Sequence, residues 1–274
     1  MGWRTGVCEG DVVSFGAPMT VVTFNLRFAN ETDQHPWSAR RPILIRQIAD
    51  IAPAVLGTQE GLRSQLDDVA LGLPDHYAWV GTSRKGATED EYCAVFYDQR
   101  RLELVAADHQ WLSETPDVPG SVSWGRLPRM LTAVSFRDAE AGELLVVNTH
   151  FDHWSLRARR FGADQLVSYL RTHAQGRPVV VMGDFNTGAR ISRAYRSLLD
   201  TPLVDVFDVA ERPGPEHPTF ANYQPPRRRG PRIDWLLVSP DVAVVDCAVD
   251  DRSFDGAYAS DHLPVTATLC LPIP

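Results

Sequence analysis

The stretch from Val179 to Thr187 constrains the fold most, because an apolar run stops at a glycine and then delivers two polar side chains. The run Val179 to Met182 predicts a buried central strand, and Gly183 marks its carboxyl end. In layered α/β proteins ligands bind at that end, where side chains stand above the sheet. Asp184 and Asn186, two positions apart, point the same way from an extended backbone. Taken alone, the segment slightly favours an Asx-type turn over a site.

The same pattern recurs elsewhere and reverses that preference. A strand beginning at Thr20 carries Asn25, which fits a structural hydrogen-bonder and a site residue about equally. The segment 54–60 ends in Glu60, at a strand-to-helix junction where a carboxylate also suits the helix dipole. The strand 144–148 runs into His150. Because several strands end in polar groups, we favour the site interpretation for all of them.

Later segments add further candidates. Asp234 opens the apolar strand 233–238, where its burial requires a cationic or hydrogen-bonding partner. Asp261 and His262 stand side by side before the last strand, 265–269. A loop holds the basic residues Arg227, Arg228, Arg229 and Arg232, which could either grip phosphates or form a solvated surface run.

The remaining periodicity predicts an α/β chain. Apolar residues at helical spacing predict helices over 37–51, 62–73, 155–174 and 191–199. Further strands are expected at 77–80, 93–97, 101–112 and 130–136, and 113–128 is a Pro/Gly/Ser-rich loop. The arginines of the helix over 155–174 are interpreted as a solvated face.

Composition narrows the function classes. The 274 residues, 44% of them hydrophobic, can form one domain of two packed sheets as readily as two domains. A formal net charge of −8 argues weakly against tight non-specific DNA binding. The four cysteines match no metal pattern and indicate free thiols in a reducing compartment.

The ends and the apolar runs suggest a location. No stretch is long and apolar enough to span a bilayer, and no signal-peptide pattern opens the chain, so we expect a cytoplasmic protein. Residues 1–18 are aperiodic and predict a disordered extension, or sequence upstream of a natural start at Met19. Residues 19–274 then form a single domain.

The dispersed polar residues indicate one site at which several strands converge. Carboxylate-rich sites with few histidines favour hard cations, namely Mg²⁺ or Mn²⁺. Mg²⁺ in turn usually acts on phosphates, so the expected substrate is a phosphoester. Its hydrolysis needs a cation near the developing oxygen charge and a base for water.

Six motifs in order resemble those of the endonuclease/exonuclease/phosphatase (deoxyribonuclease I-like) superfamily. They are Thr23 to Arg27, Gly57 to Glu60, Asn148 to His150, Gly183 to Asn186, Arg232 to Asp234 and Ser260 to His262. The likeness covers Thr20 to Leu271. It implies a four-layer α/β/β/α sandwich with two packed mixed β-sheets and one active-site cleft.

The resemblance also implies roles for single residues. Glu60 would hold the divalent metal with Asn25 and Asp261 nearby, and Asp184 with Asn186 would activate the attacking water. His150 and His262 would contact the scissile phosphate, with Asp234 supporting His262 and Glu91 pairing with His150. Arg129 would contact phosphate, as would Arg232 from the basic loop. The mechanism expected is in-line attack by water without a covalent intermediate.

The substrate stays open. Arg27 stands where abasic-site endonucleases of this superfamily carry an acid, which makes that branch less favoured. A phosphodiesterase or nuclease would run a polyanion along the arginines and stack bases on Trp residues. A phosphatase or phosphodiesterase for a small or lipid-derived substrate would use them on one terminal phosphate. A non-catalytic scaffold would have lost site residues, and the sequence indicates no obligate protein partner.

Overall fold

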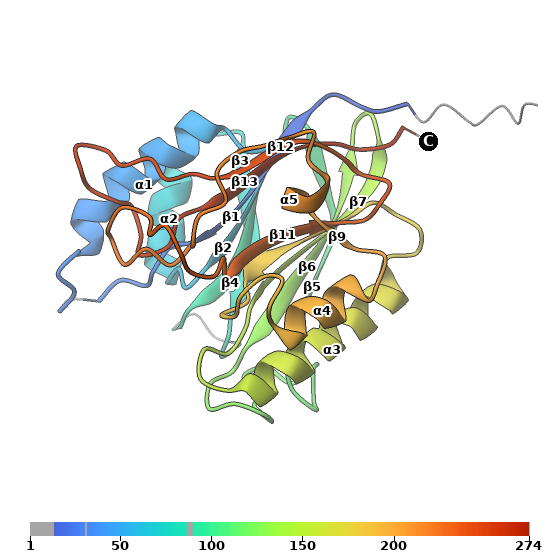
Figure 1. The fold of residues 1–274 in the computed structure, drawn as a ribbon, viewed down its shortest axis with the longest axis horizontal. Helices are drawn as coiled ribbons and strands as arrows, with labels where there is room; N and C mark the ends of the chain where they lie inside the picture. The colour runs from blue at the N-terminus through green and yellow to red at the C-terminus, as the bar shows by residue number, and fades with distance from the viewer. Residues whose placement is uncertain (1–13, 31, 87–89, 274) are drawn as a thin grey trace, which may run out of the picture.

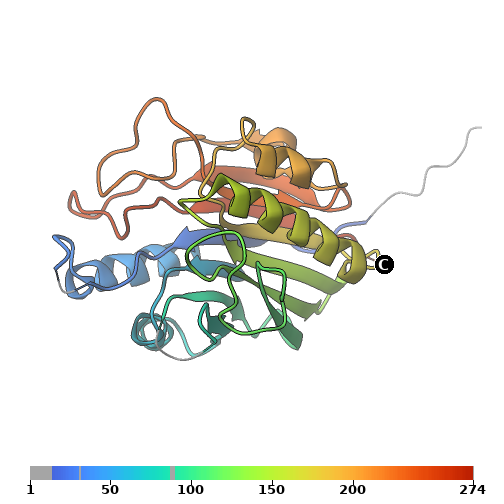
Figure 2. The ribbon, with the colours of Figure 1, turned by 90° about the horizontal axis from the view of Figure 1, so that it is seen from below.

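The computed structural model describes residues 14–30, 32–86 and 90–273. Within them, two mixed β-sheets pack face to face and helices cover both outer faces (Figures 1 and 2). The four-layer α/β sandwich expected from the sequence is therefore confirmed.

The first sheet has the strand order β10-β12-β13-β1-β2-β4-β3. At its centre β1 and β2 are parallel neighbours, whereas β13 and β4 join them antiparallel on either side. Its strands are β1 (Met19–Asn25), β2 (Val55–Gln59), β3 (Tyr77–Ser83), β4 (Tyr92–Asp98), β10 (Arg212–Pro213), β12 (Ala243–Val249) and β13 (Val265–Cys270).

The second sheet has the order β5-β6-β7-β8-β11-β9. Here β7 and β8 are the parallel central pair, and β6 and β11 flank them antiparallel. Its strands are β5 (Leu102–Trp111), β6 (Met130–Asp138), β7 (Gly142–His150), β8 (Val179–Asp184), β9 (Val204–Asp205) and β11 (Asp234–Val238).

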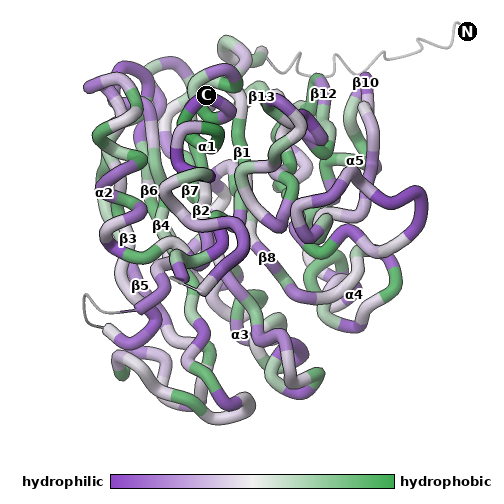
Figure 3. Tube along the Cα trace, turned by 90° about the vertical axis from the view of Figure 1, so that its left-hand side faces the viewer, coloured by the Kyte–Doolittle hydropathy of each residue, from purple (hydrophilic) through white to green (hydrophobic). Residues whose placement is uncertain are grey.

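The helices form the outer layers. Helices α1 (Trp37–Ile51) and α2 (Arg63–Gly72) pack on the first sheet through one apolar cluster, and α3 (Leu156–His173) and α4 (Arg193–Leu199) pack on the second through another. A short helix, α5 (Val206–Val209), follows β9. Hydrophobic and hydrophilic residues alternate around the helices, as the colouring of Figure 3 shows, which suits elements that are covered on one side only.

Strand β8 shows why its sequence is almost wholly apolar. Val180 and Met182 face the core between the sheets, whereas Val179 and Val181 belong to the cluster that α3 covers. Because both faces of the strand are covered, a continuous apolar run replaces the alternating pattern of a half-exposed strand.

Three further predictions can be compared with the structure. Residues 1–13 of the expected disordered extension lie outside the described residues. The expectation fails for 14–18, because Phe15 pairs with Pro272 and the Gly16 N–H donates to the carbonyl of Leu271 at 2.9 Å. Cys93, Cys247 and Cys270 are free thiols. No helix in the described part of the chain has the length and apolar character needed to cross a membrane.

Candidate active site

Polar side chains from both sheets meet at one edge of the sandwich. The parallel pairs β1/β2 and β7/β8 both end there, and they bring together Asn25, Glu60, His150 and Asp184. Strand β11 runs antiparallel to β8, so its first residue, Asp234, lies opposite Asp184. The polar strand ends that recur along the sequence thus lie together at one edge of the sandwich.

A cleft of about 690 Å³ opens at this edge. Most of the predicted site residues line it, namely Glu60, Glu91, Arg129, His150, Asp184, Asn186, Asp261 and His262. Asn25 and Asp234 are buried behind them and hydrogen-bond to Asp184 and His262 respectively. Of the predicted site residues, only Arg232 lies elsewhere.

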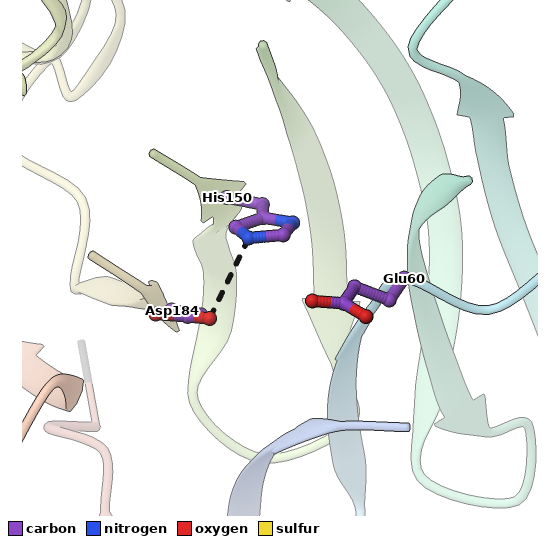
Figure 4. Close-up of side chains that lie close together, drawn as sticks. All are labelled: Glu60, His150 and Asp184. Atoms are coloured by element: carbon purple, nitrogen blue, oxygen red, sulfur yellow. Dashed lines mark ion pairs between the residues drawn. The ribbon is translucent and has the colours of Figure 1, made fainter. Parts of the chain in front are cut away.

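An acidic centre joins the two sheets. The Asn25 amide donates to Glu60 Oε1 and to Asp184 Oδ2, each at 3.0 Å. Figure 4 shows the Glu60 carboxylate directed toward His150 and Asp184, and ligand atoms of these three residues lie within 4.8 Å of one another. Burial, reinforced by the charge of Asp234, raises the pKa of Asp184. The centre therefore holds more negative charge than its surroundings stabilise.

His262 is a buried cation beside this centre. Its Nδ1 lies 2.9 Å from Asp234 Oδ2, and its Nε2 lies 3.8 Å from Asp184 Oδ2. Burial alone would lower the pKa of His262, but Asp234 and Asp184 together raise it well above the usual value. The ring is therefore an imidazolium at neutral pH, with Nδ1–H donating to Asp234.

His150, in contrast to His262, is neutral. Burial, and then the positive charge of Arg129, lower its pKa well below the usual value. Arg129 Nη1 donates to His150 Nδ1 at 2.8 Å, so a neutral ring carries its proton on Nε2. The acceptor on that side is Asp184 Oδ2, 3.5 Å from Nε2, whereas Asn186 Nδ2, at 3.0 Å, is itself a donor and donates to the carbonyl of Phe151. The two histidines thus offer one neutral and one charged N–H donor.

Glu91 does not pair with His150 as predicted. Its Oε2 bonds to Arg84 Nη1 at 2.6 Å and lies 3.7 Å from Arg129 Nη1, and Arg129 in turn reaches His150. Burial, together with the charge of Glu60, raises the pKa of Glu91 to about 7 against the effect of both arginines. Glu91 therefore acts on His150 through an interposed guanidinium.

Arg232 is not available to a substrate, which corrects the sequence-based assignment. Its side chain is 2% exposed, with Nη2 2.6 Å from Asp205 and Nε 3.1 Å from Glu216. This ion pair holds the start of β11 against β9. The neighbouring Arg227, Arg228 and Arg229 lie exposed in the loop, outside the residues that line the cleft.

Three basic residues of the cleft had not been predicted as site residues, namely Arg27, Arg84 and His153. Arg27 could have been found, because it stands two positions after Asn25 at a strand end. His153 accepts from Arg129 Nη2 at 2.8 Å. Arg27, Glu60 and Asn186 also have left-handed backbones, with φ of 55°, 64° and 50°. Such strained conformations directly after strands cluster at functional sites.

The donor set fits a hard divalent cation. Glu60 and Asp261 offer carboxylate oxygens on the cleft wall, with side chains 16% and 13% exposed. Burial raises the pKa of Asp261, and Glu60 acts in the same direction against His262 and Arg27. A cation between such carboxylates would remove this repulsion. Asn25 Oδ1 accepts from the Arg27 N–H at 2.9 Å, so its amide would have to turn to offer oxygen to a metal.

Known proteins are similar to this chain in fold and in sequence. Residues 22–262 match the Endonuclease/Exonuclease/phosphatase family. A family protein of Bacteroides thetaiotaomicron is 30% identical, with 94% of this chain and 97% of that chain covered and a TM-score of 0.88. A mannosyl-6-phosphatase of the same organism is 30% identical, with 92% and 99% covered and a TM-score of 0.85.

A relative of uncharacterized function comes from Acanthamoeba polyphaga mimivirus. It is 24% identical over 69% of this chain and 73% of its own length. The matched segment runs from residue 22 to residue 262 and so contains all six motifs that carried the resemblance. This chain belongs to the endonuclease/exonuclease/phosphatase family of phosphoester hydrolases.

Proposed function

We propose that this chain hydrolyses a phosphodiester bond with the help of Mg²⁺ or Mn²⁺, by direct attack of water on phosphorus. The observation that carries the proposal is the convergence, in one cleft, of a carboxylate of raised pKa with a charged and a neutral histidine. A base for water and donors for phosphate oxygens are what such a hydrolysis requires.

Each residue has a definite task in this proposal. Asp184 accepts the proton of the water, which Asn186 orients, while the new P–O bond forms and the bond to the leaving oxygen breaks. His262, held by Asp234, and His150, held by Arg129, donate to the phosphate oxygens. Glu60 would hold the metal, with Asp261 and Asn25 nearby. A bound divalent cation supplies positive charge for the phosphate.

A second candidate is hydrolysis of a phosphomonoester on a sugar. The observation that favours it is the likeness to the mannosyl-6-phosphatase, at 30% identity and with 99% of that chain covered. Arginines on the cleft wall, Arg27, Arg84 and Arg129, suit the dianion of a monoester as well as a diester. A cytoplasmic location stays a prediction from the sequence.

A substrate panel tests the proposal. Bis-p-nitrophenyl phosphate, mannose 6-phosphate, p-nitrophenyl phosphate and single-stranded DNA are each incubated with Mg²⁺, Mn²⁺ or EDTA. We expect metal-dependent cleavage of a diester, and Asp184→Asn should lower kcat at least about 10³-fold. Asp138→Asn is the matched control, since it alters a buried aspartate at the end of β6, paired with Gly142 at the end of β7 that lies away from His150. Full turnover by Asp184→Asn would refute the assignment, and cleavage of monoesters alone would favour the second candidate.

Metal binding is tested separately at Glu60. Glu60→Gln should raise the Mn²⁺ dissociation constant, measured by calorimetry without substrate, at least about tenfold. The exposed Glu114→Gln serves as control. An unaltered Mn²⁺ titration in Glu60→Gln would remove Glu60 from the metal site.

A further inference from the structure

A second groove lies beside the active-site cleft, between the first turn of α3 and the start of α4. It has a volume of about 690 Å³, and its walls include Arg157, Arg159, Arg160, Arg193, Leu156 and Ile191. No acidic residue is among the described residues that line it. Figures 1 and 2 show α3 and α4 side by side on the outer face of the second sheet.

The groove adjoins the catalytic residues along the chain. Thr187, which lines it, directly follows Asn186. Arg159 Nη1 donates to the carbonyl of Asp152 at 2.7 Å, two residues after His150. A ligand that occupies the cleft could therefore continue into the groove.

The arginines are placed where they weaken the helix. The first turn of α3 has no acidic residue and contains Arg157 and Arg159, with Arg160 directly after it, although a helix N-terminus favours negative charge. Each such cation destabilises the helix through its dipole. The whole chain is acidic, with a net charge of −8. An unfavourable local concentration of positive charge in an acidic protein indicates a role other than folding.

Packing holds these guanidiniums over the groove. Arg157 and Arg160 lie 5.5 and 5.7 Å from the Phe161 ring, which stacks on Trp124 at 4.8 Å. Arg159 Nε is buried and has no hydrogen-bond partner among the described residues.

Few carboxylates neutralise the cluster. Within the described ranges, Arg157 and Arg193 make no ion pair, and Arg160 meets Asp164 only at 4.0 Å with both side chains about half exposed. An exposed pair of that length contributes little. The positive charge therefore remains available to a ligand.

We propose that this groove binds the backbone phosphates of a single-stranded nucleic acid whose scissile phosphate lies in the cleft. Exposed apolar side chains beside the arginines support this occupant: Trp154, Leu156 and Ile191 are 71%, 75% and 73% exposed. Proteins that bind single-stranded nucleic acids use arginines to contact the phosphates and apolar surfaces to pack against the bases. The inference rests on the proposed phosphodiesterase function and specifies its substrate class.

The test measures binding without catalysis. A fluorescein-labelled thymidine oligonucleotide of about twelve residues is titrated by anisotropy in EDTA, between about 50 and 200 mM KCl. Arg157→Gln/Arg193→Gln should reduce the slope of log K against log[salt] by about 1.4, as two lost phosphate contacts on a single strand require. Arg171→Gln/Arg196→Gln removes the same charge from the same helices outside the groove, and should leave the slope unchanged.

Two outcomes would overturn the inference. An equal loss in both double variants would show that net charge alone drives binding. Thymidine dinucleotide bound as tightly as the longer strand would show that no second phosphate is engaged. Failure of the proposed function is distinguishable, because it appears as absence of metal-dependent hydrolysis and leaves the binding comparison in EDTA readable.

Discussion

The guanidinium of Arg40 ties the end of β1, which carries Asn25, to the segment that leads to Asp261. It is 2% exposed, and its Nη1 donates to the carbonyls of Leu26 at 2.8 Å and Ala259 at 3.1 Å. Its Nη2 donates to the carbonyl of Arg27 at 3.0 Å. One planar group thus sets the spacing between the end of β1 and the loop that leads to Asp261.

Arg40→Lys should therefore lower both stability and metal affinity. A single ammonium cannot reproduce the planar fork, so buried carbonyls lose partners and the free energy of unfolding falls by about 2–3 kcal/mol. Urea unfolding measures this, and calorimetry should show weaker Mn²⁺ binding. Arg41→Lys, which alters an exposed pair with Asp68, should change neither. Loss of stability with unchanged Mn²⁺ affinity would confine Arg40 to a structural role.

The buried carboxylate of Asp138 should make the free energy of unfolding depend on pH. Burial alone would raise its pKa, but hydrogen bonds from Arg101 Nε at 2.7 Å and from the N–H groups of Glu140 and Ala141 outweigh burial and lower the pKa. A carboxylate of depressed pKa stabilises the fold above its unfolded pKa of about 4, and this contribution is lost as pH falls further. Asp138→Asn should thus differ from wild type in urea unfolding at pH 7 and converge with it as the pH falls through the lowered folded-state pKa.

At single residues, some positions could be predicted from the sequence and others could not. The strand-end positions of Asp184 and His150 follow from an apolar run that stops, a signal that the sequence contains. That Arg129 stands between Glu91 and His150 depends on the pairing of Met130 with His150 across β6 and β7. No local pattern encodes this contact.

At the level of elements, the end of β8 depends on one glycine. Gly183 has φ of 152°, and a Cβ there would lie 2.1 Å from the Thr149 carbonyl oxygen. Gly183→Ala should lower the free energy of unfolding, measured in urea, by about 3 kcal/mol. The Thr149 backbone atoms cannot move aside as the end of a flexible side chain can. Gly176→Ala, at φ of 77° with open space around it, should cost only about 1 kcal/mol. Equal losses would show that the close approach to β7 imposes no constraint.

The elements were predicted best where periodicity is strong. The helices over 37–51 and 155–174 match α1 and α3 within a residue at each end. Strand β12 was missed because its run holds Asp246 and a bulge between Val244 and Asp246, which interrupts the alternation. The two-residue strands β9 and β10 are too short to leave a pattern. Arg232 was misassigned for a related reason, since its partner Asp205 lies in one of these short strands.

At the scale of the molecule, the two sheets are joined by a polar contact beneath the cleft. Gln59 of β2 donates to Asn148 Oδ1 of β7 at 2.7 Å, and the Asn148 amide donates to the carbonyls of Thr58 and Ala94, each at 2.8 Å. All four residues are completely buried. The resemblance to a family predicted that the sheets pack together, but periodicity alone could not show which side chains meet between them.

A double-mutant cycle across this contact tests whether the sheets are held in register by it. Gln59→Met and Asn148→Leu should each lower the free energy of unfolding by about 2–3 kcal/mol, because each leaves buried polar groups of the other sheet without partners. The double variant should lose at least about 1 kcal/mol less than the sum, since the second change removes a group already left unpaired. Urea unfolding of the four proteins measures the coupling. Strict additivity would mean that the sheets are positioned by the apolar core alone, and the cleft above them would then not depend on this contact.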